Sequence, residues 1–238
     1  CIRDSYDDEA GIHLQLIDTG ETRTIPQPTG LGREVTGWWP VGWFPDGTKF
    51  LAQVATMGPE HSSVWAISML GGIPHEIHEG GFAQSVSPDG SLVAFTSTSF
   101  NSDIFVMGTN GEAPRKVVTG EQGESFHNVI WSPDSRRIAY GRFRVGADGT
   151  QVDIESRDLN GGKVALILSD PRLATGYGGF WWLTDGRVIY SLGEAASLLG
   201  WDVFTDTNFW QIPVDAQSGK PTGNPRRVAN WTDFSPNA

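Results

Sequence analysis

The sequence predicts an all-β protein built from repeated four-stranded antiparallel sheets. Turns of the S-P-D-G type recur at intervals of 43, 45 and 51 residues, with their aspartates at Asp46, Asp89, Asp134 and Asp185. Each turn is followed by an alternating apolar run that is typical of a strand, such as 92–95 or 137–140. No window of helical length shows a sustained 3.6-residue period. Because the repeat has the length of one propeller blade, the predicted fold is a β-propeller.

Each repeat is predicted to contain four strands in a fixed order. The first strand ends directly before the turn, at Trp43, Val86, Trp131 and Trp182. The second follows the turn, and the third contains SVWAISM, DIFVMGT, VDIESRD or NFWQIPV. A hairpin rich in Gly, Asn and Pro leads to a short fourth strand in PHEIHE, PRKVV, KVALI or PRRVA. The segment LGEAASLLG near residue 195 is the one plausible helical turn.

The aspartates of the four turns are predicted to be structural. An aspartate at this position can bond the backbone two residues further on, which stabilises the turn. A catalytic carboxylate pair has to be unique and to converge on one point, whereas these residues recur in every repeat. We therefore expect Asp46, Asp89, Asp134 and Asp185 to serve their own turns.

The first repeat lacks its inner strand. It begins with CIR as the end of a second strand, followed by GIHLQLID as the third and TRTIP as the fourth. If DFSPNA at the other end is an inner strand, it would complete this blade and give five blades; if it is the loop before such a strand, the ring would have six. The expected organisation is one domain over 1–238, with blade pieces at about 1–37, 38–80, 81–125, 126–178, 179–230 and 231–238.

Composition and charge argue against several classes of function. The formal net charge is −11, and the basic residues are scattered, which disfavours nucleic acid and anionic lipid as partners. There is no run of about eighteen apolar residues, so we expect no membrane insertion by this chain. His75 and His78 in HEIHE would face opposite sides of a strand, and no metal or cofactor is expected.

The repeated motifs resemble the TolB-like or PD40 (WD40-like) β-propeller family. The resemblance rests on the S-P-D-G turn, the I-A-F/Y strand, the D-I-F/Y-V-M strand and the hairpin before P-R-x-V, and it runs from GIHLQLID to PRRVA. Thr184 replaces the proline of the turn, Ser135 replaces its glycine, and the fourth repeat has a long insertion. The segment 209–236 is similar to propellers attached to bacterial serine/threonine kinases or to winged-helix regulators. This resemblance implies a periplasmic, extracytoplasmic sensor or docking domain, carried by a larger and membrane-anchored signalling protein.

The chain is predicted to bind rather than to catalyse. It has no G-x-S-x-G elbow and none of the kinase motifs. We expect a protein, a peptide or a small ligand to bind where the irregular loops gather at one end of the channel. The candidate residues on those loops are His61, Phe100, Asn101, Phe126, His127, Tyr177, Trp201 and Phe204. Three alternatives remain open: a carbohydrate-active propeller enzyme, a peptidase-gating propeller, and assembly through an exposed sheet edge.

Overall fold

The structure is a computed structural model, and its described part contains strands and no helix. The strands form five antiparallel sheets in which consecutive strands are neighbours. The described residues are 2–8, 11–16, 19–29, 31–32, 34–57, 62–69, 73–97, 101–146, 149–170, 172–173, 179–193 and 207–229. The predicted helical turn near residue 195 lies outside them. Within them, no helix is long and apolar enough to cross a membrane.

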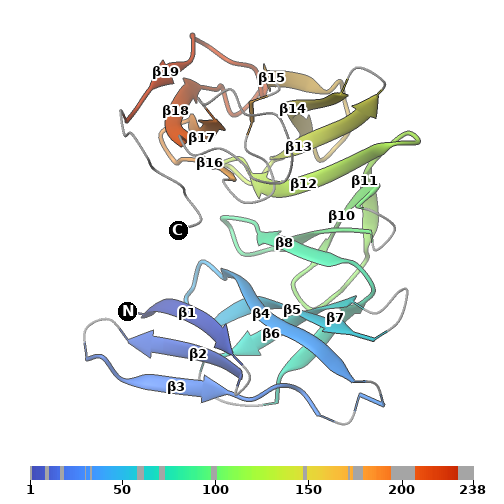
Figure 1. The fold of residues 1–238 in the computed structure, drawn as a ribbon, viewed down its shortest axis with the longest axis vertical. Coiled ribbons are helices and arrows are strands. Elements are labelled where there is room, and N and C mark those ends of the chain that lie inside the picture. Colours follow the sequence, from blue (N-terminus) through green and yellow to red (C-terminus); the bar gives the residue numbers. More distant parts are fainter. Residues whose placement is uncertain are drawn as a thin grey trace. The chain divides into compact units, whose positions relative to one another are not determined.

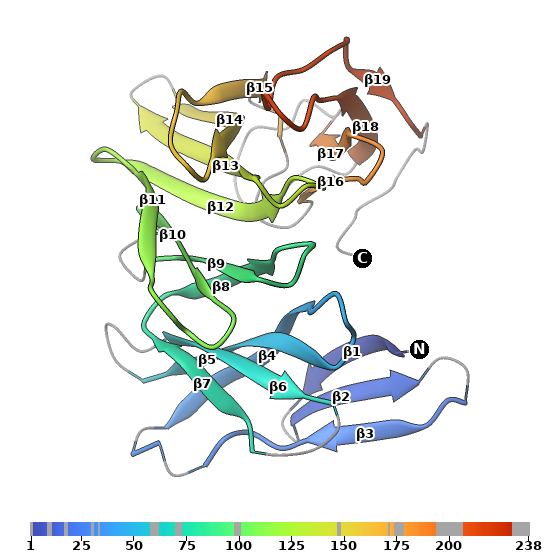
Figure 2. The same ribbon diagram turned by 180° about the vertical axis from the view of Figure 1, so that it is seen from behind.

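The chain divides into two compact units, and the first unit, Cys1–Thr119, contains three sheets (Figures 1 and 2). The first sheet has three strands: β1 (Ile2–Asp8), β2 (Gly11–Leu16) and β3 (Thr22–Ile25). The second sheet consists of β4 (Val35–Trp43), β5 (Lys49–Thr56), β6 (Ser62–Ser68) and β7 (His75–Glu79). The third sheet consists of β8 (Phe82–Val86), β9 (Leu92–Thr96), β10 (Asp103–Gly108) and β11 (Arg115–Thr119).

The second unit, Gly120–Ala238, contains two four-stranded sheets. The fourth sheet consists of β12 (Glu124–Trp131), β13 (Arg137–Gly146), β14 (Gly149–Asp158) and β15 (Ala165–Ser169). The fifth sheet consists of β16 (Phe180–Trp182), β17 (Arg187–Gly193), β18 (Thr207–Pro213) and β19 (Arg226–Arg227). The predicted all-β fold of four-stranded blades is confirmed, and the first sheet has three described strands, as expected. The first strands end at the four predicted residues, Trp43, Val86, Trp131 and Trp182.

The turns between the first and second strands are held by their aspartates. In each, Oδ1 accepts a hydrogen bond from the backbone N–H two residues later, at 2.9 Å for Asp46, 3.0 Å for Asp89, 3.2 Å for Asp134 and 3.1 Å for Asp185. This is the bond expected of an Asx turn. In the third sheet, Ser87 Oγ also donates to Asp89 Oδ1 at 2.6 Å. The carboxylates are therefore engaged at the turns of separate sheets.

Apolar side chains from neighbouring sheets form the core of each unit. In the first unit, one cluster joins residues such as Ile12 and Trp38, and another joins Leu51 and Phe95. The core of the second unit joins the fourth and fifth sheets through buried residues that include Ile154, Phe180, Val188 and Tyr190. Full burial of one such side chain contributes roughly 1.5–3 kcal/mol to stability. The packing of neighbouring sheets within each unit is therefore stabilised by the apolar side chains between them.

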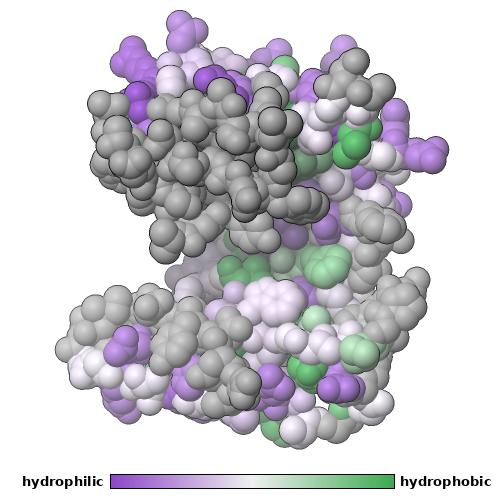
Figure 3. Space-filling model, in the orientation of Figure 1, coloured by the Kyte–Doolittle hydropathy of each residue, from purple (hydrophilic) through white to green (hydrophobic). Residues whose placement is uncertain are grey.

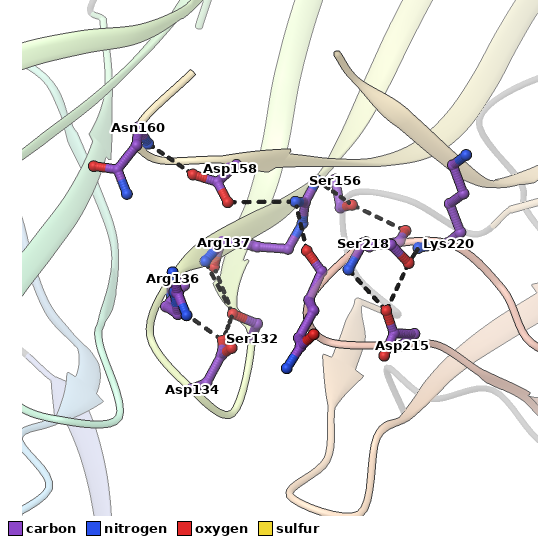
Figure 4. Close-up of polar contacts among 12 residues, drawn as sticks. Ser132, Asp134, Arg136, Arg137, Ser156, Asp158, Asn160, Asp215, Ser218 and Lys220 are labelled. Atoms are coloured by element: carbon purple, nitrogen blue, oxygen red, sulfur yellow. Dashed lines mark hydrogen bonds and ion pairs between the residues drawn. The ribbon is translucent and has the colours of Figure 1, made fainter. Parts of the chain in front are cut away.

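A polar clamp ties the fourth sheet to the fifth (Figure 4). Arg137 of β13 is 5 % exposed, and its Nη1 donates to the backbone carbonyl of Gln217 at 3.1 Å. The same guanidinium lies 3.6 Å from the carboxylate of Asp158. Ser156 Oγ donates to the carbonyl of Gly219 at 3.0 Å. These contacts fix the connection between β18 and β19 against β13 and β14.

The surface of the second unit is polar on the part that carries β19. Hydrophilic side chains predominate there in the space-filling view (Figure 3), and both residues of β19, Arg226 and Arg227, are exposed. Large exposed apolar side chains elsewhere in this unit include Val145, Leu166 and Trp181. Isolated apolar residues are common on protein surfaces, whereas grouped ones indicate contact sites.

Candidate functional site at the loop end of the sheets

Each four-stranded sheet has two distinct ends. The S-P-D-type turn joins its first and second strands at one end, which we call the turn end. The connection from the second strand to the third therefore lies at the opposite end, which we call the loop end. Ligands of scaffold proteins bind mainly where such irregular loops gather. The loop end of the fourth sheet is formed by the start of β12, the end of β13 and the start of β14.

Five charged residues form a network at the loop end of the fourth sheet, and we call them the Arg142 cluster: Glu124, Arg142, Arg144, Asp153 and Glu155. Arg142 Nε donates to Glu124 Oε1 at 3.0 Å, and Arg142 Nη1 donates to Glu155 Oε1 at 3.2 Å. Arg144 Nη2 binds the Asp153 carboxylate. All three carboxylates belong to residues less than 9 % exposed.

Strand register explains why these charges meet. Arg144 lies opposite Glu124 on β12, and Arg142 lies opposite Asp153 on β14. Alternate residues of one strand share a face, so both arginines project to the same side of the sheet as the acids beside them. The ion pairs to Asp153 and Glu155 run diagonally between neighbouring strands, within reach of long side chains.

The electrostatics of the cluster keep its charges fixed. Burial alone raises the pKa of Glu124, but the Glu121 backbone N–H and the Arg142 guanidinium outweigh it and hold this pKa below the ordinary value of 4.5. Burial raises the pKa of the Tyr140 phenol, which lies beside Glu155. A general acid needs a carboxyl pKa raised toward the working pH, and Glu124 shows the opposite shift.

The loop placement predicted for Phe126 and His127 is wrong, because both residues lie in strand β12. Phe126 is 1 % exposed and packs edge-on against Tyr140, with ring centroids 5.3 Å apart. It is therefore a core residue. The His127 ring packs edge-on against the Phe143 ring, with the ring centroids 4.9 Å apart, and His127 Nε2 lies 3.1 Å from Ser125 Oγ. Burial lowers the pKa of His127, so its imidazole is neutral at pH 7.

Strand β12 is interrupted next to His127. Its register against β13 shifts between His127 and Ile130, and Asn128 has a left-handed backbone with φ of 54°. Asn128 Nδ2 donates to the Phe180 carbonyl at 3.1 Å, which links the first strands of the fourth and fifth sheets. Trp181, beside Phe180, is 50 % exposed. Bulges of this kind redirect side chains and are frequent next to binding sites.

Asn101 lies at the loop end of the third sheet. Its backbone is also left-handed, with φ of 53°. Thr96 Oγ1 donates to Asn101 Oδ1 at 2.6 Å, and Gln84 Nε2 donates to the same Thr96 hydroxyl at 3.4 Å. This chain of hydrogen bonds fixes the orientation of the Asn101 amide, and its role in binding stays a prediction.

The other predicted binding residues, His61, Phe100, Tyr177, Trp201 and Phe204, lie outside the described residues. Within the described part, no group of three or more His, Cys, Asp or Glu residues could hold a metal ion.

The Arg142 cluster was not anticipated from the sequence. The signal for it is present in GRFRV and VDIES, where arginines and acids each occupy alternate positions. If the two segments form neighbouring strands, those charges fall on one face and can pair. The turn and repeat motifs alone do not carry this information.

Solved structures with the same architecture include a TolB-like protein from Agrobacterium tumefaciens. It is 18 % identical with a TM-score of 0.66, and the match covers 94 % of this chain and 75 % of that chain. The chain has a TolB-like β-propeller fold. The oligogalacturonate lyase from Vibrio parahaemolyticus is 15 % identical with a TM-score of 0.62, over 92 % of this chain and 60 % of that one.

The propeller domain of the Trilobed protease from Pyrococcus furiosus is 13 % identical with a TM-score of 0.54, over 83 % of this chain and 57 % of that chain. This chain thus spans less than two thirds of the lyase and of the protease domain. No protein-family model and no curated protein matches the sequence.

Proposed function

We propose that this chain is a non-catalytic propeller that binds a protein, a peptide or a small ligand at its loop end. It would act as the sensor or docking domain of a larger bacterial signalling protein, on the extracytoplasmic side of the membrane. The proposal rests chiefly on the Arg142 cluster, in which a guanidinium holds two buried carboxylates at the loop end of the fourth sheet. Paired charges of this kind give a rigid polar surface suited to recognition.

The exposed member of the cluster indicates what the surface can bind. The Arg144 side chain is 34 % exposed, compared with 4 % for its partner Asp153. A guanidinium has five N–H donors, and the ion pair to Asp153 leaves some of them for a ligand carboxylate or a peptide carbonyl. Since Asp153 fixes the side chain in advance, binding loses less conformational entropy than it would with a mobile arginine.

NMR titration can test this proposal with two probes, trialanine as a peptide and trigalacturonate as an acidic sugar. We expect the arginine side-chain N–H signals of the Arg142 cluster to shift while the probe is recovered unchanged. Arg144→Gln should weaken binding about tenfold, equivalent to about 1.4 kcal/mol. The control Arg136→Gln, at an exposed position of the turn end, should have no effect. Equal effects of the two substitutions would contradict a loop-end site.

The alternative is a carbohydrate-active propeller enzyme. It is favoured by the convergence of Glu124 and Glu155 on one guanidinium and by the structural likeness to an oligogalacturonate lyase. In the same titration, conversion of trigalacturonate to an unsaturated product, abolished by Arg144→Gln or Glu155→Gln, would establish this alternative and overturn the non-catalytic role.

A further inference from the structure

The outer strands of the four-stranded sheets differ at one equivalent position. Opposite the same register position of the third strand, β7 has Glu76, β11 has Lys116 and β19 has Arg227, whereas β15 has Leu166. Two residues before this position in the sequence, the second, third and fifth sheets have a proline: Pro74, Pro114 and Pro225. The fourth sheet has Val164 there.

Proline and charge are the usual protection of a free sheet edge. Proline has no N–H to offer to an added strand, and a charged side chain resists the loss of water that pairing requires. The outer strands β7, β11 and β19 each have a proline directly before them and a charged residue at the equivalent position, and β15 has neither feature. Val164 is 41 % exposed and Leu166 is 52 % exposed. Leu166 lies in β15, and Val164 directly precedes the first residue of that strand.

The irregular pairing of these outer strands does not account for the difference. A register shift occurs against the third strand in β7, β11 and β15 alike. Among the described strands, β15 pairs with β14 only. What distinguishes its outer edge is therefore the replacement of proline and charge by two exposed apolar side chains.

We propose that the outer edge of β15 binds an extended, basic peptide segment of a partner protein by strand addition. The peptide would pair through its backbone and place apolar side chains against Val164 and Leu166. This surface lies on the outer strand of the fourth sheet, and its existence does not depend on the loop-end site.

Two observations favour a peptide over a second copy of this chain. A strand of five residues buries far less than the roughly 1,200 Å² of a stable protein interface. Each copy also carries a formal charge of −11, so two copies repel one another, while the same field attracts a basic segment. The strand itself, Ala165–Ser169, contains no charge; Lys163 lies on its N-terminal side, next to Val164, and Asp170 directly follows it.

Fluorescence anisotropy with a labelled heptapeptide of alternating lysine and valine can test this proposal. We expect saturable binding to the full chain, weakened at least tenfold in the double variant Val164→Pro/Leu166→Lys. This variant copies residues that the third sheet already has at Pro114 and Lys116, so the fold should be retained, which circular dichroism can verify. The control Val145→Lys adds the same charge at a residue that is 74 % exposed on β13, and it should bind as the parent chain does.

A second peptide separates backbone pairing from charge attraction. N-methylation of alternate amides on its pairing edge should abolish binding while leaving its charge intact. The proposal is overturned if the methylated peptide binds equally well, if the unmethylated peptide does not bind, or if Val145→Lys weakens binding as much as the double variant. Sedimentation showing a dimer that the double variant dissociates would overturn the choice of a peptide as the occupant.

Discussion

Ser156 Oγ on β14 donates a 3.0 Å hydrogen bond to the backbone carbonyl of Gly219, which lies 63 residues further along the chain. Gly219 has φ of +70°, and a Cβ added to it would meet Ser156 Oγ at 1.9 Å and Arg137 Nε at 2.5 Å. The connection between β18 and β19 therefore approaches the fourth sheet as closely as a backbone without a side chain permits (Figure 4).

Gly219→Ala should lower the free energy of unfolding by more than about 2 kcal/mol, because it combines a left-handed backbone with a steric clash. Gly47→Ala provides the matched control. Gly47 has nearly the same φ, +68°, but nothing lies within 4 Å of its added Cβ. Urea denaturation of both variants separates the two costs, and equal losses would show that the close approach contributes nothing.

Arg142→Met should destabilise the fold by about 3 kcal/mol, because it leaves buried carboxylates without their cation. The carboxylates concerned are those of Glu124 and Glu155. Adding Glu124→Gln and Glu155→Gln to the same variant should restore at least half of the lost stability, since no buried charge then remains unpaired. If the triple variant is no more stable than Arg142→Met, packing rather than charge accounts for the loss. Urea denaturation at neutral pH is the appropriate measurement.

The stability of the second unit should fall as the pH drops below about 6.5, through His127. Burial lowers the pKa of His127 from its ordinary value of 6.5, so the unfolded chain binds a proton more readily than the folded one. Its contribution is present above pH 6.5 and is lost as the pH falls toward the folded-state pKa. His127→Gln should reduce the loss of stability measured between about pH 7.5 and about pH 5.5, and an unchanged loss in this variant would contradict the role of His127.

Asp89→Ala should lower the free energy of unfolding by about 1–2 kcal/mol, because the hydroxyl of the buried Ser87 loses its hydrogen-bond acceptor. Asp46→Ala should cost less, because the residue two positions before Asp46 is Phe44 rather than a serine. Thermal unfolding of the two variants provides the comparison. A greater loss for Asp46→Ala would contradict a special role of the Ser–Asp pair.

The strands and turns could be predicted because short-range chemistry determines them. Pro88, Asp89 and Gly90 suit one turn type, and the alternating run after them suits a strand with one buried face. The start of β12 could not be predicted in this way. Glu124, Ser125 and His127 have the composition of a loop, yet they pair with the long strand β13.

That pairing is possible because partners far along the chain compensate the polar residues. Arg142 neutralises Glu124 and Phe126 fills space against Tyr140, so the segment tolerates burial that its own sequence disfavours. The same reason explains why the Arg142 cluster was missed. A turn motif carries its own hydrogen-bond partners, whereas an ion pair between strands depends on register.

The glycine contact at Gly219 has a counterpart in the first unit. Gly111, in the hairpin between β10 and β11, lies so close to β7 that an added Cβ would meet the Ile77 carbonyl oxygen at 2.0 Å. In both units, the last hairpin of one blade is shaped to fit the blade before it. Chimeras made with a related protein should therefore assemble only when two adjoining blades are transferred together. The unit that can be exchanged is then the junction between two blades, and not the single blade.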